Sequence, residues 1–290
     1  MAFPFIIPSQ RKPQQNMTPD SEYRYSKLFK LTVFAIIFSG CHLKEANQSL
    51  PENKIELPTV TVKPDTVAET KNTIYLTFDD GPNRGTEHVL DIVNKEQVPI
   101  TMFLIGQQVY GSLWQKALLD SIRSNKLIEM ANHSFTHAHN HFQKFYSTPI
   151  NTVFDFKRCA DSLQLAANIV RTPGRNIWRL NNINSTDEKR CIAAADTLRQ
   201  YGYNVIGWDL EWHFDNSLHL QKTSDQLVSQ IDTLFAKNQL KIPGHLVLLM
   251  HDQVFTDSAD ASTLNDFVSK LKSSGNYRFE MISKYPGLKN

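Results

Sequence analysis

From Asn72 onward, short apolar runs typical of strands alternate with segments of helical periodicity. The predicted strands are Ile74–Phe78, Ile100–Ile105, Ile128–Asn132, Asn168–Arg171, Asn204–Trp208, Leu246–Met250 and Arg278–Met281. The predicted helices are Glu87–Lys95, Trp114–Ser124, 151–167, Thr186–Gln200, Ser224–Ala236 and Ser262–Ser273. Strands that alternate with helices pair in parallel through right-handed crossovers. About seven such units predict an α/β fold whose strands form a barrel rather than an open sheet, with the chemistry at the C-terminal strand ends.

The composition is that of an ordinary globular protein. The chain has 290 residues, of which 41% are hydrophobic and 21% are charged, and its net charge is +2. This balance argues for neither a nucleic-acid-binding protein nor a strongly acidic substrate. Three cysteines, Cys41, Cys159 and Cys191, are too few and too scattered for a disulfide framework or a cysteine zinc site. Cys159 and Cys191 fall in predicted helices, which favours buried thiols over a bridge between them.

The N-terminal segment has the organisation of an export signal. Residues 1–26 are polar, basic residues follow, and a short apolar run from Leu31 to Phe38 ends at Ser39-Gly40-Cys41. This order predicts a secretory signal, and the apolar run is too short to span a bilayer. A Cys directly after Ser-Gly resembles the lipobox of bacterial lipoproteins, which implies that Cys41 is lipidated. The alternatives are a simple anchor or a cleaved signal, and Met17 is an alternative start of the chain.

We therefore expect three parts along the chain. Residues 1–41 are the signal and lipobox segment with a polar N-terminal extension. Residues 42–71 are rich in Glu, Lys, Asn, Thr and Pro and are expected to be a flexible tether. Residues 72–290 are the folded domain. The expected location is that of an exported, membrane-anchored lipoprotein facing the periplasm or the cell surface.

The stretch Ile74–Pro82 ends the first predicted strand in two adjacent carboxylates, Asp79 and Asp80, followed by a Gly-Pro turn. Successive strand residues point to opposite faces, but Gly81 allows the backbone to turn sharply, so both carboxylates can converge on the mouth of the sheet. Two close carboxylates repel when both are ionised, and a cation or a partner base resolves that repulsion. The alternative is an acidic turn that caps the next helix.

Other polar residues follow the later predicted strands, so they share one rim of the barrel. They are His133 and His137 after the third strand, Arg171 after the fourth, Asp209 and Glu211 after the fifth, and His251 after the sixth. On a helical turn, two histidines four residues apart share a face and can bind one metal ion. A nearby carboxylate would complete a His-His-Asp site with a position open for water. His139 and His141 continue the run, either as surplus ligands or as solvated loop residues.

Two of these segments match the motifs of a known family. Thr77-Phe78-Asp79-Asp80-Gly81-Pro82 and the run from Glu129 to His137 resemble the first and second motifs of the polysaccharide deacetylase family. This family is also called the NodB-homology domain or carbohydrate esterase family 4. The run from Ile100 to Gly106 resembles the strand between the two motifs, and the likeness extends from about Asn72 to Lys284.

The resemblance implies a distorted (β/α) barrel that hydrolyses the N-acetyl amide of amino sugars in a cell-surface or extracellular polysaccharide, either peptidoglycan-like or chitin-like. It also implies one divalent metal ion, most often zinc, with cobalt, nickel, iron or manganese as other candidates. By position, the implied ligands are Asp80, His133 and His137. Asp79 is the implied general base and His251 the implied general acid. The expected partners are an acetylated glycan and a membrane, with no nucleic acid.

The third motif departs from the family pattern, which is Arg-x-Pro-aromatic-Gly. Here it reads Arg171-Thr172-Pro173-Gly174-Arg175, so the aromatic wall is missing. Arg171 keeps the position of the catalytic arginine, and Gly174 keeps the backbone N–H that is expected to hold the oxyanion. Arg175 places a cation where the family has glycine. It either favours a glycan that carries a carboxylate or phosphate, or it is a solvated rim residue.

The fourth motif departs as well, since the family pattern is Asp-x-x-Asp-Trp and the chain has Trp208-Asp209-Leu210-Glu211-Trp212. The motif is one residue short and has Glu for the second Asp. Either Asp209 or Glu211 is therefore expected to pair with Arg171 and orient Asp79. Trp212 has two open interpretations, a platform for a sugar ring or a core residue.

Two alternatives to the N-deacetylase remain. One is a hydrolase of the same fold that acts on another ester, amide or imide. The other is an inactive, glycan-binding surface lipoprotein. The chain keeps the full set of acid, base and metal-ligand residues: Asp79, Asp80, His133, His137 and His251. This argues against an inactive protein, because a binding module needs no such set.

Overall fold

The computed structural model describes residues 72–288. The strands are β1 (Asn72–Gly81), β2 (Ile100–Leu104), β3 (Ile128–Asn132), β4 (Ile169–Val170), β5 (Ile177–Arg179), β6 (Asn184–Thr186), β7 (Asn204–Val205), β8 (Leu210–Glu211), β9 (His245–His251) and β10 (Tyr277–Phe279). The helices are α1 (Arg84–Glu96), α2 (Leu113–Ser124), α3 (Phe142–Ser147), α4 (Pro149–Leu163), α5 (Ile192–Gln200), α6 (Ser224–Ala236) and α7 (Ser258–Ser274). None of these helices has the length and apolar character needed to cross a bilayer. The predicted signal, tether and Cys41 lie outside the described residues.

The strands form a distorted (β/α) barrel, which confirms the predicted fold class. Parallel pairs link β10 to β1, β1 to β2 and β9, β2 to β3, β3 to β4, β4 to β7, and β8 to β9. The segment from Asn204 to Glu211 pairs with β4 at its start and with β9 at its end. This one bent segment therefore connects the two sides of the sheet, and the barrel is closed by a kinked strand instead of a regular one.

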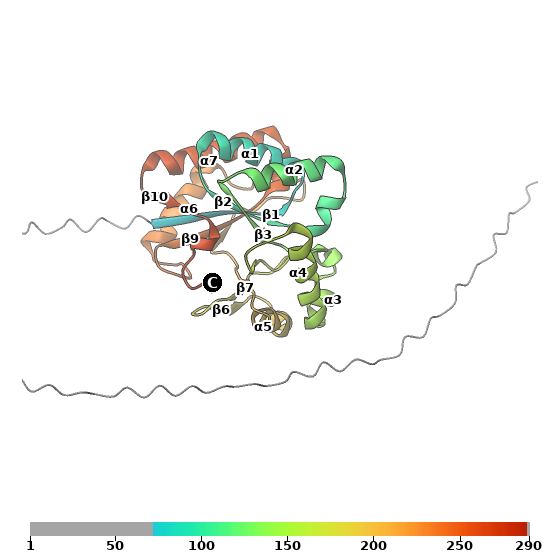
Figure 1. The fold of residues 1–290 in the computed structure, drawn as a ribbon. Coiled ribbons are helices and arrows are strands. Elements are labelled where there is room, and N and C mark those ends of the chain that lie inside the picture. Colours follow the sequence, from blue (N-terminus) through green and yellow to red (C-terminus); the bar gives the residue numbers. More distant parts are fainter. Residues whose placement is uncertain (1–71, 289–290) are drawn as a thin grey trace, which may run out of the picture. The chain divides into compact units, whose positions relative to one another are not determined.

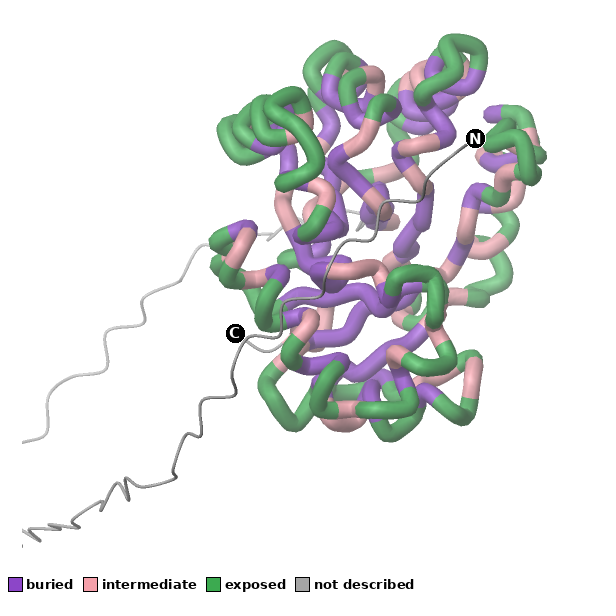
Figure 2. The backbone as a smooth tube through the Cα atoms, turned by 90° about the vertical axis from the view of Figure 1, so that its right-hand side faces the viewer, coloured by how far each residue is buried: buried purple, intermediate pink, exposed green. Residues whose placement is uncertain are grey.

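The alternation of side chains along β1 separates two hydrophobic clusters. Ile74, Leu76 and Phe78 pack in the larger cluster, which includes buried residues of α1, α2, α6 and α7. Tyr75 packs in a second cluster together with residues of β2, β3 and β9, and Asp79 has the same alternation as Tyr75. Figure 1 shows α1, α2 and α7 side by side on one side of the strands, and Figure 2 shows buried backbone along the strands and exposed backbone on the surrounding helices. Asp79 thus lies on the barrel's inner side.

Part of the predicted element order is wrong between residues 177 and 191. The helix predicted over Thr186–Gln200 begins only at Ile192, and Asn184–Thr186 forms an antiparallel hairpin with β5. Arg179 stabilises this hairpin, because its Nη1 donates to Ser185 O at 3.0 Å and to Thr186 Oγ1 at 2.9 Å. The helical pattern of the sequence around Thr186 does not show that Arg179 makes these contacts, so it did not predict the hairpin. The short helix α3 was not predicted either.

The two cysteines of the domain are free and buried, as their positions in predicted helices favour. Cys159 packs in the larger cluster beneath α4, and Cys191 packs in a third cluster with residues of α4, α5 and β7. Burial raises the pKa of the Cys159 thiol to about 12, so it is a protonated core side chain at neutral pH.

Candidate active site

β1 brings two carboxylates to the mouth of the barrel. Asp79 is opposite His251 of β9 in the parallel register, so the two side chains belong to the same face of the sheet. Asp80 has a φ of 76°, a left-handed conformation that is uncommon for a residue other than glycine. This turn of the backbone keeps the Asp80 carboxylate at the mouth, since a regular strand would direct it to the opposite face. Both carboxylates converge there, as predicted.

Three side chains form a cluster of metal-ligating atoms at this mouth. Asp80 Oδ1 lies 3.4 Å from His133 Nε2 and 3.2 Å from His137 Nε2. Asp79 lies beside the cluster, with its Oδ2 3.7 Å from His133 Nε2. His139 and His141 are exposed and lie outside the cluster. The structure therefore brings together the three predicted ligands and supports the interpretation of His139 and His141 as solvated loop residues.

The hydrogen bonds of the cluster fit a bound cation. His133 Nδ1 lies 3.0 Å from the carbonyl oxygen of Arg171, which only accepts, so Nδ1 carries a proton and, when the ring is neutral, Nε2 presents a lone pair to Asp80. Asp80 Oδ1 is buried and has no hydrogen-bond partner among the described residues. A lone pair that faces a buried carboxylate oxygen is unfavourable without a positive charge between them. A divalent ion with a coordination position for each atom satisfies all three groups.

Burial and mutual charge set the protonation of these groups. Burial by itself raises the pKa of Asp80, but contacts with His133 and His137 more than offset this and hold that pKa below its usual value. Burial lowers the pKa of His137, and the charge of His133 lowers it further. Burial by itself lowers the pKa of His133, but the nearby Asp79 and Asp80 outweigh burial, so this pKa is raised. An ionised carboxylate beside a neutral His137 is the protonation state that metal binding requires.

A strained loop carries the two histidines, and it differs from the right-handed helical turn that we expected. Four successive residues from His137 to Asn140 have positive φ values between 47° and 59°. Each such residue costs roughly 1–2 kcal/mol. Several side chains hold the loop in place: Asp155 Oδ2 accepts from the backbone N–H of Phe135 and Thr136, and Ser134 Oγ accepts from His137 N at 3.0 Å. Strain held by surrounding contacts is characteristic of functional sites.

Arg171 is fully buried and holds Asp79 directly. Its Nη1 donates to Asp79 Oδ1 and to Thr77 Oγ1, each at 2.8 Å, and its Nη2 donates to Gly207 O at 3.0 Å. The guanidinium also lies 4.1 Å from the centre of the Phe103 ring. Burial lowers the pKa of Arg171, and the charge of Asp79 opposes that change. The buried ion pair fixes one oxygen of Asp79 and leaves the other, Oδ2, facing His133.

Comparison with known proteins finds a family that resembles this chain. Residues 66–179, which include both the Asp79-Asp80 turn and the histidine loop, match the family model for polysaccharide deacetylase. In this segment the chain is similar to the polysaccharide deacetylase family. It is 24% identical over 219 residues to YheN of Bacillus subtilis, covering 72% of this chain and 67% of YheN. It is 26% identical over 222 residues to the peptidoglycan-N-acetylmuramic acid deacetylase PdaA of Bacillus subtilis, covering 73% of this chain and 70% of PdaA.

The same fold occurs in a solved structure of the family. The carbohydrate esterase family 4 esterase of Streptococcus mutans superposes with a TM-score of 0.54 at 21% identity, covering 73% of this chain and 86% of the esterase. This likeness shows a shared fold. The chain thus resembles polysaccharide deacetylases in sequence and shares the fold of the esterase.

His251 ends β9, the strand next to β1, so it lies beside Asp79 at the mouth of the barrel. Its Nδ1 is buried and has no hydrogen-bond partner among residues 72–288. The ring of Phe214 packs against it edge to face, with 5.2 Å between the ring centres. His251 is therefore held by packing and by its strand, without a carboxylate on Nδ1 that would fix its tautomer.

The fourth-motif acids do not pair with Arg171, which corrects the expectation for Asp209 and Glu211. Asp209 accepts hydrogen bonds from the backbone N–H groups of Lys241 at 2.8 Å and Val247 at 2.9 Å. Glu211 lies 3.5 Å from His213 Nδ1 and affects Arg171 only through its charge. The motif is one residue shorter than in the family. Arg171 pairs with Asp79 itself and not with an acid of the fourth motif.

Trp212 is a core residue, so it offers no surface to a sugar ring. It is almost completely buried, it packs against Phe255 and Phe267, and its indole N–H donates to Lys222 O at 3.0 Å. Gly174, in contrast, is exposed and occupies the third position of a turn, with a φ of 64°. The turn is closed by Arg175 N, which donates to Thr172 O at 3.3 Å. The structure thus places Gly174, but not Trp212, where a substrate has access.

Asp252 is a residue of this region that sequence analysis did not single out. Its carboxylate is fully buried and accepts hydrogen bonds from Asn83 Nδ2 and Thr86 Oγ1 at the start of α1. A Cβ atom at Gly81 would lie 2.5 Å from Asp252 Oδ2, so only glycine permits this close approach. Asp252 therefore ties the end of β9 to the turn after the two catalytic-site carboxylates. Its position next to His251 was the only sequence signal.

We expect Asp252 to make the metal-free protein less stable as the pH rises from about 4 to about 7. Burial raises the pKa of Asp252 from 3.8 to about 7, so within this window the folded state binds a proton that the unfolded state has lost. A difference of about 3 units corresponds to a loss of up to about 4 kcal/mol of unfolding free energy. Asp252→Asn mimics the protonated carboxyl and should remove this slope. Denaturant unfolding of both proteins at pH 4.5 and 7.5 tests this, and identical pH dependence would contradict it.

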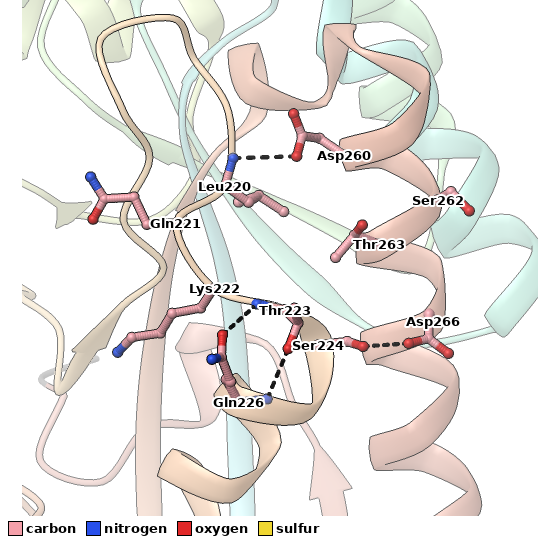
Figure 3. Close-up of a pocket in the computed structure, with 10 residues that line it drawn as sticks. All are labelled: Leu220, Gln221, Lys222, Thr223, Ser224, Gln226, Asp260, Ser262, Thr263 and Asp266. Atoms are coloured by element: carbon pink, nitrogen blue, oxygen red, sulfur yellow. Dashed lines mark hydrogen bonds between the residues drawn. The ribbon is translucent and has the colours of Figure 1, made fainter.

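Figure 3 shows another hollow, whose lining includes none of the three metal-ligating residues. It has a volume of about 570 Å³ and lies between the segment Leu220–Gln226 and helix α7. Its polar groups bond to one another: Asp260 accepts from Leu220 N, and Ser224 bonds to Asp266. None of the predicted site residues lines it. We therefore assign the candidate active site to the mouth of the barrel.

Proposed function

We propose that this chain is a metal-dependent N-deacetylase that hydrolyses the acetamide of amino sugars in a cell-surface or extracellular polysaccharide. One observation supports it above the others: Asp80, His133 and His137 converge next to Asp79, and His251 is the register partner of Asp79 on the neighbouring strand. This arrangement combines three ligands with a base and an acid. Zinc fits the ligand set best, since two imidazoles and one carboxylate with an open position are typical of catalytic zinc.

In the proposed mechanism each residue has a separate task. A divalent metal ion, when bound by Asp80, His133 and His137, supplies a Lewis acid that polarises the amide carbonyl and lowers the pKa of water. Asp79 accepts the proton of the attacking water through Oδ2, the oxygen that Arg171 leaves free. Arg171 holds Asp79 in place through the hydrogen bond from Nη1 to Asp79 Oδ1.

His251 then acts on the leaving group. It donates a proton to the amine nitrogen, which otherwise leaves poorly. The N–H of Gly174 is exposed and has no hydrogen-bond partner among the described residues, so it is free to stabilise the oxyanion. Bond by bond, water adds to the carbonyl carbon, the C–N bond breaks, and acetate and a free amino sugar are released.

Acetate release from a panel of substrates tests the proposal. The zinc-loaded protein is mixed with N-acetylated chitin oligomers, peptidoglycan fragments, O-acetylated xylan and a cyclic imide. Acetate from the N-acetylated glycans supports the N-deacetylase. Turnover of only the ester or the imide supports another hydrolase of the same fold. Glycan binding with no turnover of any substrate supports an inactive binding protein.

We further propose that the chain is exported and anchored by a lipid on Cys41. The support is the order of basic, apolar and small residues before Cys41 in the sequence. Cys41→Ser should move the protein from the membrane fraction to the soluble fraction while acetate release per molecule stays the same. Fractionation followed by mass analysis of the N-terminus measures this. A Cys41→Ser protein that still sediments with membranes and keeps its N-terminus indicates an uncleaved anchor instead.

A further inference from the structure

Beside the metal-ligating cluster lies a second hollow, which we call the basic hollow. Its volume is about 930 Å³, and its lining comes from the end of the histidine loop, from α3, and from the segments after β4 and β6. Three lining residues are basic and none is acidic: Lys144, Arg175 and Arg190. A concave surface lined by cations without carboxylates attracts negatively charged groups.

Arg175 is the residue of the basic hollow with the most unused hydrogen-bonding capacity. Its Nη1 donates to Gly174 O at 3.1 Å, and its side chain also interacts with the Cys191 thiol, while its buried Nε has no hydrogen-bond partner among the described residues. A half-buried guanidinium with a free N–H is a donor that a carboxylate or phosphate can satisfy. Arg190 differs, since Glu188 accepts from both its Nε and its Nη2. Arg175 and Lys144 therefore supply the charge of the basic hollow.

Phe142 connects the basic hollow to the metal-ligating cluster. Its ring packs edge to face against His137, with 5.6 Å between ring centres, and it also lines the hollow. A Cβ at Gly174 would lie 3.2 Å from two atoms of the same ring, so the phenyl group occupies the space beside this glycine. The aromatic group missing from the third motif is thus supplied by another segment. A group bound in the basic hollow lies next to the proposed reaction site.

We propose that the basic hollow is a subsite for a negatively charged substituent of the glycan, a carboxylate or a phosphate, recognised by Arg175 with support from Lys144. The proposal rests on the proposed function and narrows it to anionic glycans. Because Arg175 offers a planar fork of donors, it favours a planar carboxylate or a tetrahedral phosphate over neutral hydroxyl groups. Lys144 is exposed and adds a flexible point charge.

The test compares three matched probes with the zinc-loaded protein. They are a neutral chitin tetramer, the same tetramer with lactyl carboxylates, and the same tetramer with phosphate groups. Arg175→Gln should lower kcat/KM on the charged probes more than on the neutral one, by a factor of about ten to a hundred, mainly through KM. Lys144→Gln should act in the same direction but less strongly. Lys189→Gln, an exposed residue that does not line the hollow, is the control for loss of a nearby charge and should leave the preference unchanged.

Dissociation constants for the same probes separate failure of this subsite from failure of the proposed function. If no probe releases acetate, the N-deacetylase proposal fails, but tighter binding of a charged probe that Arg175→Gln removes still supports the subsite. An effect on the lactyl probe alone, or on the phosphate probe alone, supports the subsite and identifies the group. Equal losses on charged and neutral probes, or no loss on any, would overturn it and leave Arg175 a solvated rim residue.

Discussion

His133→Ala should lose its metal and, with it, the release of acetate. Nε2 of His133 lies 3.4 Å from Asp80 Oδ1, and its Nδ1 is fixed by the Arg171 carbonyl, so the ring is held with Nε2 toward Asp80. Loss of a partner that merely orients a ligand lowers metal affinity about 10- to 100-fold. Loss of the ligand itself should therefore lower zinc affinity by more than about a hundredfold. Metal analysis after dialysis against a weak chelator measures the effect.

Two companion variants make this result specific. His137→Ala removes the other imidazole from a less buried position, so it should lose metal with less damage to packing. His139→Ala is the control, because His139 belongs to the same loop but is exposed and outside the cluster. It should keep its metal and its activity. Full zinc occupancy in His133→Ala or His137→Ala would refute the ligand assignment, and circular dichroism of each variant shows whether it folds.

Asp79→Asn should keep the metal but lose most of the activity. Asp79 is the proposed base, and a general base typically contributes a factor of about 10² to 10⁴ to the rate. We expect kcat for acetate release to fall within that range while bound zinc stays at the wild-type level. The same change removes the only carboxylate that pairs with the buried Arg171 among the described residues. Breaking a buried ion pair costs about 3–5 kcal/mol, so the variant should also unfold more easily.

Asp91→Asn is the matched control for the Asp79 variant. Asp91 is an exposed carboxylate on α1, so its replacement should change neither the rate nor the free energy of unfolding appreciably. Wild-type kcat in Asp79→Asn would exclude the role of base. Loss of zinc in Asp79→Asn would instead show that Asp79 is a ligand, in agreement with its 3.7 Å distance from His133 Nε2.

Strand ends were the part of this site that sequence could predict. A buried strand is visible in the sequence as a run of apolar residues. In a parallel barrel the C-terminal ends of all strands lie on one rim, so the residues that follow the strands lie there too. For that reason the sequence places Asp79, His133, Arg171 and His251 on one rim, and the structure has them there. The helix Ser224–Ala236 has its predicted bounds, and in the structure Thr223 Oγ1 caps its start by accepting a hydrogen bond from Gln226 N.

Contacts between distant segments could not be predicted. The left-handed turn from His137 to Asn140 opposes local preference and depends on Asp155, a residue of α4 whose role appears only when the helix packs against the loop. The burial of Trp212 likewise depends on Phe255 and Phe267, far along the chain. The partner of Arg171 was assigned to the wrong acids, because spacing in the fourth motif says nothing of how the bent segment from Asn204 to Glu211 directs its side chains.

A zinc titration of the metal-free protein, with bound metal and acetate release measured on the same samples, tests the central claim most directly. A mixture of N-acetylated chitin and peptidoglycan fragments serves as the substrate. We predict no acetate release without metal, a rate that rises in proportion to bound zinc, and saturation at one ion per chain through Asp80, His133 and His137. Acetate release at the full rate in the metal-free protein, or no release from any glycan at one bound zinc per chain, would contradict the account.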